Sequence, residues 1–356
     1  MRAALALARR ALGATWPNPA VGCVLVKDGI VVARGATAPG GRPHAEAVAL
    51  AAAGTAARGA TAYVSLEPCA HHGRTPPCAD ALAAAGVARV VYAVEDPDPR
   101  TKGGGAGALI RANVAVEDGV LADEASEINA GFFLRVREGR PLVTFKTATS
   151  LDGRIAAAGG RSQWITGEAA RAAAHALRAN HDAVMIGAST LAADDPLLTV
   201  RLPGQPVRPP VRIAVAGRAM VAAGRKLFAS LDAGPVWLVL AEGTAPPRDL
   251  PPGVEIVSVA AGALGRPDPR AMLLEFGRRG LTRVLVEGGA RLAGALMRAG
   301  LVDRIAWFRA PLVLGGDGVP ALEALGIADP NDAPRWRRLD MRTLGADTLE
   351  TFAALR

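Results

Sequence analysis

The chain has 356 residues, half of them hydrophobic, which is more than one ordinary domain needs and indicates about two. This composition excludes an intrinsically disordered or fibrous protein. The formal net charge is +8, carried mostly by scattered arginines, and only 4% of the residues are aromatic, so the sequence offers little for nucleic-acid bases to stack on. We therefore expect no nucleic-acid partner.

No stretch of the sequence reaches the roughly 18 uninterrupted apolar residues of a membrane-spanning helix, so we expect no membrane partner. The first residues predict an amphipathic helix with Leu5, Ala8 and Leu12 on one face, because Arg9 and Arg10 interrupt the apolar run that a signal peptide requires. Three cysteines are too few for a disulfide scaffold and fit a reducing compartment. The sequence predicts a soluble, cytoplasmic protein.

Strand and helix patterns alternate along the first 140 residues, as in α/β domains. Strands are expected at 21–26, 30–33, 61–66 and 89–94, and helices at 45–53 and 78–85. Residues 96–105 are rich in Gly, Pro and Asp and predict a loop. The polar segment 135–140, followed by Pro141, is the expected boundary between two domains, residues 1–140 and 141–356.

The second domain repeats the α/β alternation without an internal sequence repeat. Strands are expected at 142–147, 183–186, 211–215, 236–240, 254–259, 283–287 and 304–308. Helices are expected at 168–179, 269–278 and 290–299. The two halves therefore have the pattern of two different α/β folds joined in one chain.

One histidine and two cysteines in the first domain form a pattern typical of a zinc enzyme. His44 precedes the helix 45–53, Cys69 follows the strand 61–66, and Cys78 begins the helix 78–85 directly after two prolines. One imidazole and two thiolates make a three-ligand site with a fourth position free for water, as catalytic zinc sites require. The helix N-terminus should also favour the thiolate of Cys78. We expect one Zn²⁺ per chain.

Glu46, two residues after His44, is the expected catalytic residue. Zinc lowers the pKa of a bound water toward about 7, and Glu46 would carry the water's proton to a ring nitrogen and to the departing ammonia. A His-x-Glu motif followed by Pro-Cys-x-x-Cys is typical of zinc nucleobase deaminases, although here eight residues separate the cysteines. The alternative is a closed structural site with His71 or His72 as fourth ligand, and Cys23 is interpreted as a core residue.

Seven short motifs follow one another along the chain. They are PNPAVGCV at 17–24, HAE at 44–46, EPCAHHGRTPPC at 67–78, KTATSLDGR at 146–154, SQWIT at 162–166, LAADDPLLTVR at 191–201 and VEGGA at 286–290. In this order and spacing they resemble the bifunctional deaminase–reductase family of riboflavin biosynthesis, and the longer cysteine spacing is that family's own. The resemblance implies a three-layer N-terminal domain similar to cytidine deaminase and a C-terminal α/β domain similar to dihydrofolate reductase.

The resemblance also implies two successive reactions on a phosphorylated pyrimidine. The first domain would hydrolytically deaminate 2,5-diamino-6-(5-phosphoribosylamino)pyrimidin-4(3H)-one with zinc. The second would use NADPH to reduce 5-amino-6-(5-phosphoribosylamino)uracil to the ribitylamino product. Because both domains handle the same intermediate, a homo-oligomer, dimer or tetramer, is expected.

Site residues carry over by motif position. The zinc ligands would be His44, Cys69 and Cys78, with Glu46 as proton shuttle and Asn18 near the ribose. The reductase substrate would contact Ser162, Arg178, Leu198, Arg201 and Glu287. NADPH would contact Ala148, Trp164, Thr190, Asp194, Gly289, Ala290, Arg291, Leu292, Ala293, Gly294 and Ala295. The guanidinium groups of Arg178 and Arg201 are suited to binding the substrate's phosphate. The amides that follow the Gly288-Gly289 turn, at the start of a helix, are suited to binding the pyrophosphate of NADPH.

Three positions depart from the family pattern. Ala70 stands where the family usually has a serine, and Leu312 stands where a lysine is common. Gly217, in the pair Ala216-Gly217, stands where the family often has Asp-Ser against the cofactor. Two other functions are considered beside the leading one. The first is a nucleoside or tRNA-type deaminase with a degenerate reductase-like domain, which the low aromatic content disfavours. The second is a zinc-stabilised interaction module, for which replacing Glu46 would change nothing measurable.

Overall fold

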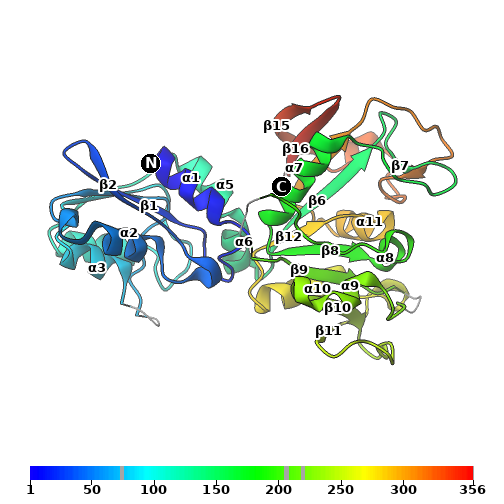
Figure 1. Cartoon of the computed structure of the whole chain (residues 1–356), viewed down its shortest axis with the longest axis horizontal. Helices are drawn as coiled ribbons and strands as arrows, with labels where there is room; N and C mark the ends of the chain where they lie inside the picture. Colours follow the sequence, from blue (N-terminus) through cyan, green and yellow to red (C-terminus); the bar gives the residue numbers. More distant parts are fainter. Residues whose placement is uncertain (73–75, 204–207, 218–220, 356) are drawn as a thin grey trace. The chain divides into compact units, whose positions relative to one another are not determined.

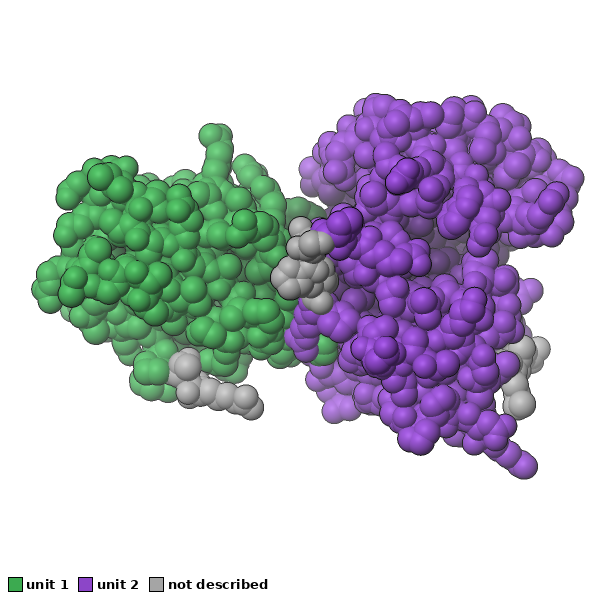
Figure 2. Space-filling model, in the orientation of Figure 1, with its two compact units in different colours: residues 1–139 green, residues 140–356 purple. Residues whose placement is uncertain are grey.

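The computed structural model describes residues 1–72, 76–203, 208–217 and 221–355. Gly73, Arg74 and Thr75, in the middle of the motif at 67–78, lie outside the described residues. The chain divides into two compact units, Met1–Gly139 and Arg140–Arg356, coloured separately in Figure 2. Each unit is built around its own β-sheet (Figure 1). None of the described helices combines the length and the apolar character that crossing a membrane would require.

Unit 1 has one five-stranded sheet in the order β2-β1-β3-β4-β5. Strand β1 is antiparallel to β2 and β3, whereas β3, β4 and β5 run parallel. The strands are β1 (Gly22–Lys27), β2 (Ile30–Ala36), β3 (Thr61–Val64), β4 (Arg89–Tyr92) and β5 (Ala115–Glu117). The helices are α1 (Arg2–Ala11), α2 (Ala45–Ala53), α3 (Cys78–Ala84), α4 (Gly104–Arg111), α5 (Ala122–Ile128) and α6 (Ala130–Glu138).

Helices cover both faces of this sheet, which gives the expected three layers (Figure 1). Helices α1 and α5 meet on one face, where Leu5, Ala8 and Ile128 form a small apolar cluster. On the other face, α2, α3 and α4 enclose the main core of the unit. Gly35 in β2 lies against α2 so closely that a Cβ atom there would come within 2.1 Å of the Ala45 carbonyl oxygen. This close packing fixes the start of α2 relative to the sheet.

Unit 2 has a nine-stranded sheet in the order β11-β10-β9-β8-β12-β6-β13-β16-β15. Neighbouring strands run parallel except that β16 is antiparallel to both β13 and β15. Its strands are β6 (Leu142–Thr149), β8 (Ala183–Gly187), β9 (Val211–Val215), β10 (Val236–Ala241), β11 (Val254–Val259), β12 (Arg283–Val286), β13 (Arg304–Arg309), β15 (Trp336–Leu344) and β16 (Asp347–Ala354). A separate pair is β7 (Arg154–Ala156) with β14 (Val319–Pro320). The helices are α7 (Glu168–Ala179), α8 (Ala188–Asp194), α9 (Lys226–Ala229), α10 (Pro269–Arg278) and α11 (Ala290–Arg298).

A buried ion pair fixes the start of strand β6 in unit 2. Asp303 accepts two hydrogen bonds from the Arg140 guanidinium, at 2.8 and 3.0 Å, and one from the Val143 backbone N–H at 2.8 Å. The register of β6, β12 and β8 then places Thr144, Leu285 and Val184 side by side on one face. Helix α7 packs on that face against β13 and β16, in an apolar cluster with Phe308.

Every predicted strand and helix is present among the described residues, with ends that differ by at most a few positions. Several elements were not predicted: α4, α5, α6, α8, α9, β5, β7 and β14, and the β15–β16 hairpin. The loop expected at 96–105 ends at Gly103, because α4 already begins at Gly104. The polar segment expected to separate the domains is helical as far as Glu138, and Gly139, with φ +73°, ends that helix.

Candidate functional sites

His44, Cys69 and Cys78 come from three separate elements and converge at one point. His44 is the residue before α2, Cys69 lies on the turn that follows β3, and Cys78 is the first residue of α3. Their ligand atoms all lie within 4.8 Å of one another. The His44 Nδ1 atom is 3.3 Å from Cys78 Sγ and 3.6 Å from Cys69 Sγ.

These distances fit a tetrahedral zinc ion. Bond lengths of about 2.3 Å to sulfur and about 2.0–2.1 Å to nitrogen give a ligand–ligand edge of about 3.6 Å in a tetrahedron. The contact with the Cys78 side chain, followed by that with His44, lowers the pKa of Cys69 to about 4. The same contact with Cys69, together with burial, raises the pKa of Cys78. A dication between the sulfurs would favour two thiolates, so this donor set suits zinc.

Neither His71 nor His72 joins the three ligands. Among the described residues, His44, Cys69 and Cys78 form the one group of His, Cys, Asp or Glu side chains spaced to hold a metal ion. The His71 Nδ1 atom is instead hydrogen-bonded to Thr101 Oγ1 at 3.0 Å. The arrangement therefore favours an open, three-residue metal centre over a closed structural one.

Glu46 lies in the first turn of α2 and is buried, with 3% of its surface exposed. Burial raises the pKa of its carboxyl to about 7, and the nearby Cys69 sulfur contributes in the same direction. The carboxyl also interacts with the Cys78 side chain, so it lies beside the three ligand atoms. A carboxyl with a pKa near neutrality can both accept and return a proton.

A second buried glutamate, Glu67, connects the metal-ligand turn to the loop that follows β4. Its carboxylate accepts four backbone N–H groups: Asp96 at 3.3 Å, Gly103 at 3.1 Å, Gly105 at 3.0 Å and Ala106 at 3.2 Å. Two of these donors belong to the first turn of α4, where N–H groups have no helical acceptor. Glu67 stands two residues before Cys69, so it fixes this loop against the ligand turn.

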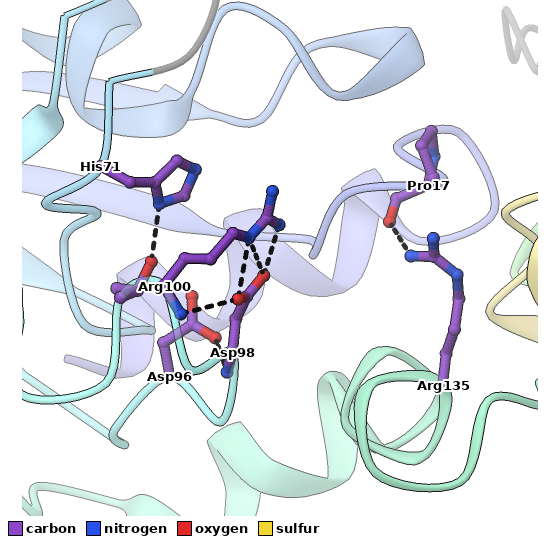
Figure 3. Close-up of polar contacts among 7 residues, drawn as sticks. Pro17, His71, Asp96, Asp98, Arg100 and Arg135 are labelled. Atoms are coloured by element: carbon purple, nitrogen blue, oxygen red, sulfur yellow. Dashed lines mark hydrogen bonds and ion pairs between the residues drawn. The ribbon is translucent and has the colours of Figure 1, made fainter.

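The loop held by Glu67 presents two carboxylates and an arginine (Figure 3). Asp98 pairs with Arg100, which lowers the pKa of Asp98, whereas burial raises the pKa of Asp96 to about 6. Figure 3 also shows Arg135 of α6 donating to the Pro17 carbonyl oxygen at 3.0 Å, next to Asn18. Asn18 donates to the Gly41 carbonyl oxygen at 2.9 Å.

Replacing Glu67 with glutamine should weaken both the loop and deamination. A carboxamide offers one acceptor oxygen and turns two N–H donors toward backbone donors, so we expect the free energy of unfolding of unit 1 to fall by about 3 kcal/mol. Hydrogen exchange at the amides of Gly105 and Ala106 would measure the loosening. Glu95→Gln is the control, because Glu95 is an exposed residue beside the same loop, and it should leave this exchange unchanged. If hydrogen exchange at Gly105 and Ala106 is unchanged in Glu67→Gln, Glu67 does not hold the loop.

In unit 2, a largely buried ion pair joins two residues predicted to contact the substrate. Arg178 of α7 donates from Nε and Nη2 to the two carboxylate oxygens of Glu287, at 2.6 and 2.8 Å. Burial opposes ionisation of Glu287, but Arg178, and then Lys146, outweigh it and lower its pKa to about 2. Lys146 of β6 is in turn enclosed, and burial lowers the pKa of its ammonium group. The cluster lies on the α7 side of the sheet, just beyond the end of β12.

The segment after α8 carries two further predicted substrate residues. Leu198 is buried with φ +56°, and Arg201 is exposed. The Thr199 carbonyl oxygen between them accepts from Arg178 Nη1 at 2.7 Å. Three of the five N–H groups of Arg178 are therefore already used, which leaves one on each terminal nitrogen. Ser162 is half-buried in the loop between β7 and α7.

Seven of the predicted cofactor residues, Gly289 and 290–295, form a glycine turn and the helix that follows it. Gly288 and Gly289 have φ of +114° and +84°, and a Cβ atom on either would lie 3.4–3.5 Å from Thr190 Oγ1. This turn leads into α11, where Ala293 N is the first amide bonded within the helix, to Gly289 O. The amides of Ala290, Arg291 and Leu292 therefore stand at the helix start, where an anion is favoured.

The remaining predicted cofactor residues differ in exposure. Ala293 and Gly294 are buried on the inner side of α11, and Ala295 follows them within the helix. Ala148 packs near Phe308 under α7, and burial raises the pKa of Asp194 at the end of α8. Trp164 is 67% exposed, and the Arg171 guanidinium lies 4.6 Å from its ring centroid.

Three residues of these sites were not identified from the sequence: Glu67, Arg171, and His175, which contacts Arg201. Arg171 and His175 share one face of α7 with Arg178, since they are spaced four and three residues apart. That spacing was visible in the sequence and is the signal that could have identified them. Glu67 directly precedes the Pro-Cys pair but has no pattern that separates it from a solvent-exposed glutamate.

Two family models match the chain. Residues 1–94 match the cytidine and deoxycytidylate deaminase zinc-binding region, and residues 141–349 match the RibD C-terminal domain. The riboflavin biosynthesis protein RibD of Escherichia coli K12 is 41% identical over 358 residues, covering 98% of this chain and 96% of that protein. The chain belongs to the RibD family. RibD of Haemophilus influenzae is also 41% identical and covers 99% of this chain and 96% of that protein.

Solved structures agree with this family. A RibD structure from Acinetobacter baumannii has a TM-score of 0.87 and 37% identity, covering 100% of this chain and 98% of that one. A Thermotoga maritima diaminohydroxyphosphoribosylaminopyrimidine deaminase/5-amino-6-(5-phosphoribosylamino)uracil reductase has a TM-score of 0.88 and 32% identity, covering 100% of this chain and 97% of that one. The predicted family and fold class are confirmed. So is the prediction of a deaminase and reductase of riboflavin biosynthesis that uses zinc and NADPH.

Proposed function

We propose that this chain deaminates 2,5-diamino-6-(5-phosphoribosylamino)pyrimidin-4(3H)-one and then reduces 5-amino-6-(5-phosphoribosylamino)uracil to the ribitylamino product. The observation that carries the proposal is the convergence of His44, Cys69 and Cys78, with their ligand atoms within 4.8 Å and the Glu46 carboxyl beside them. We assign deamination to residues 1–140 and reduction to residues 141–356.

In the deaminase, His44, Cys69 and Cys78 would hold zinc, which supplies the Lewis acidity that activates water. Glu46 takes a proton from the attacking water and delivers it to a ring nitrogen of the pyrimidine. A second proton passes through the same carboxyl to the amino group, which leaves as ammonia. Burial favours this proton transfer, because it raises the pKa of the Glu46 carboxyl to about 7, where the group can both accept and release a proton. Asn18 is assigned to the ribose side of the substrate.

In the reductase, the substrate lies between α7, the segment 198–201 and the end of β12. Arg201 is exposed and binds the 5-phosphate, aided by the two unused N–H groups of Arg178. Glu287, held ionised by Arg178, accepts hydrogen bonds from ribose hydroxyls, and Lys146 orients the substrate from β6. Ser162 and Leu198 complete the substrate contacts.

NADPH supplies the hydride for the opened ribosyl group when it is bound. The turn at Gly289 and the helix start from Ala290 to Leu292 bind its pyrophosphate. Ala293, Gly294 and Ala295 support this turn from within α11, and Thr190 closes it from α8. We assign Ala148, Trp164 and Asp194 to the remaining cofactor contacts.

Two broader properties belong to the proposal. A homo-oligomer, dimer or tetramer, would bring sites for the shared intermediate near one another, and sedimentation at working concentration would test it. A cytoplasmic location fits the three cysteines, all of which are free thiols.

Removing zinc from the purified chain should separate the two activities. A chelator is expected to abolish ammonia release from the diaminopyrimidine phosphate, and added Zn²⁺ should restore it. NADPH oxidation with the deaminated substrate should continue, because no reductase residue belongs to the His44–Cys69–Cys78 group. If ammonia release survives complete loss of zinc, the proposed deaminase mechanism is wrong.

A further inference from the structure

His175 lies on α7 between the ion pair of Arg178 and the exposed Arg201. Its Nδ1 atom is 3.3 Å from the backbone nitrogen of Arg201, and its Nε2 atom is 3.3 Å from Nη2 of the same residue. One imidazole ring therefore contacts both the main chain and the guanidinium of Arg201. Of the two contacts, the one at Nε2 reaches the Arg201 side chain, and it restricts the rotamers of a guanidinium that would otherwise move freely in solvent.

The neighbouring groups favour a neutral ring that accepts a hydrogen bond. Burial, followed by the charges of Arg178 and Arg201, lowers the pKa of His175. Glu287 and the Thr199 carbonyl, also near the ring, act in the opposite direction. A neutral imidazole has one acceptor nitrogen, whereas a protonated one has none, and guanidinium groups only donate. The ring therefore accepts from Arg201 at one nitrogen at a time: from the backbone N–H when Nδ1 is unprotonated, and from the guanidinium when Nε2 is unprotonated.

Helix α7 holds the same segment at a second point. Arg178, three residues after His175, donates to the Thr199 carbonyl oxygen at 2.7 Å, two residues before Arg201. The face of α7 that carries His175 and Arg178 thus fixes both the backbone and the terminal group of residues 199–201. The same helix face carries Arg171, which donates to the Thr166 carbonyl oxygen at 2.8 Å and covers Trp164.

We propose that His175 is a positioning residue of the reductase, which accepts at Nε2 from the guanidinium of Arg201 and aims it at the anionic group of the substrate. The inference rests on the proposed function, in that Arg201 binds the substrate's 5-phosphate. Without His175, Arg201 keeps its charge but loses the contact that orders it. Substrate binding then weakens, while hydride transfer from bound NADPH is unaffected.

Two matched substitutions test the position of the acceptor. His175→Gln can place an amide oxygen near the former Nε2, within reach of Arg201, whereas His175→Asn reaches only the position of Nδ1. In the full-length chain we expect His175→Asn to raise KM for the phosphorylated reductase substrate about tenfold, the cost of one hydrogen bond to a charged group. The values of kcat and of KM for NADPH should stay unchanged, and His175→Gln should stay close to the parent enzyme.

A double-substitution cycle distinguishes positioning from general support of the fold. Arg201→Gln alone should raise KM, and adding His175→Asn to it should produce no further increase, because the partner through which His175 acts is absent. Additive effects would overturn the proposal, as would a His175→Gln variant impaired as much as His175→Asn. If Arg201→Gln leaves KM unchanged, it is the assigned phosphate site that fails. Ammonia release by the same proteins should match the parent chain throughout.

Discussion

Replacing Glu46 with glutamine is expected to stop ammonia release while zinc binding and NADPH oxidation continue. Glutamine preserves the size of the side chain in the first turn of α2 but cannot accept and return a proton. A positioned general acid–base group contributes about 10²–10⁴-fold to rate, so deamination should fall by about that factor. Ammonia release, zinc content by elemental analysis, and NADPH oxidation on the deaminated substrate would all be measured on one preparation.

The control for this substitution is Glu117→Gln, which removes a carboxylate from the same unit at an exposed pair with Arg89. Exposed pairs contribute at most about 1 kcal/mol, so Glu117→Gln should leave all three measurements unchanged. A Glu46→Gln protein that still releases ammonia at the parent rate would remove the proton shuttle from the mechanism. Loss of zinc together with activity would instead make Glu46 a residue that supports the metal centre.

The zinc ligands could be predicted from sequence because each marks the boundary of a local element. His44 and Glu46 share the start of α2, and Cys78 follows two prolines at the start of α3. Patterns of this kind depend on neighbours within about ten residues. The pairing of Arg178 with Glu287 spans 109 positions and depends on how α7 packs on the sheet of unit 2. No local pattern reports such a contact, so the sequence predicted both residues without their mutual ion pair.

The strands that escaped prediction are mostly those with little apolar alternation. Between its two ends β15 is exposed at every position, and it contains Arg337, Arg338, Asp340 and Arg342. Its pairing with β16 depends on the backbone ladder at the sheet edge, which has no side-chain signature. Helix α6 was missed for a different reason. Its buried residues, Phe132 and Phe133, come first in the sequence and its polar last turn follows them. Buried and exposed residues therefore do not alternate with the period of a helix.

Replacing Glu287 with glutamine should both abolish reduction and destabilise unit 2. The substitution leaves the Arg178 guanidinium and the Lys146 ammonium enclosed without their countercharge. Breaking a buried ion pair from one side costs about 3–5 kcal/mol. Urea unfolding followed by tryptophan fluorescence would measure this loss, because Trp164, Trp237, Trp307 and Trp336 lie in unit 2 and only Trp16 in unit 1.

The pH dependence of this stability difference identifies its origin. The pKa of Glu287 is lowered from 4.5 to about 2 in the folded chain. A lowered carboxyl pKa contributes stability that is fully present above the unfolded value and is lost as pH falls toward the folded one. The difference between the parent and Glu287→Gln should therefore be constant near neutrality and shrink between about pH 4.5 and pH 2.

Glu275→Gln is the matched control for Glu287→Gln, since Glu275 pairs on the surface of the same unit with Arg278 and Arg279. It should change stability by at most about 1 kcal/mol and leave NADPH oxidation intact. Deamination should survive both substitutions, because Glu46 and the three zinc ligands belong to unit 1. A stability difference for Glu287→Gln that persists undiminished at pH 2 would show that lost packing, and not lost charge, is responsible. In that case the ion pair would not be what holds α7 against the end of β12.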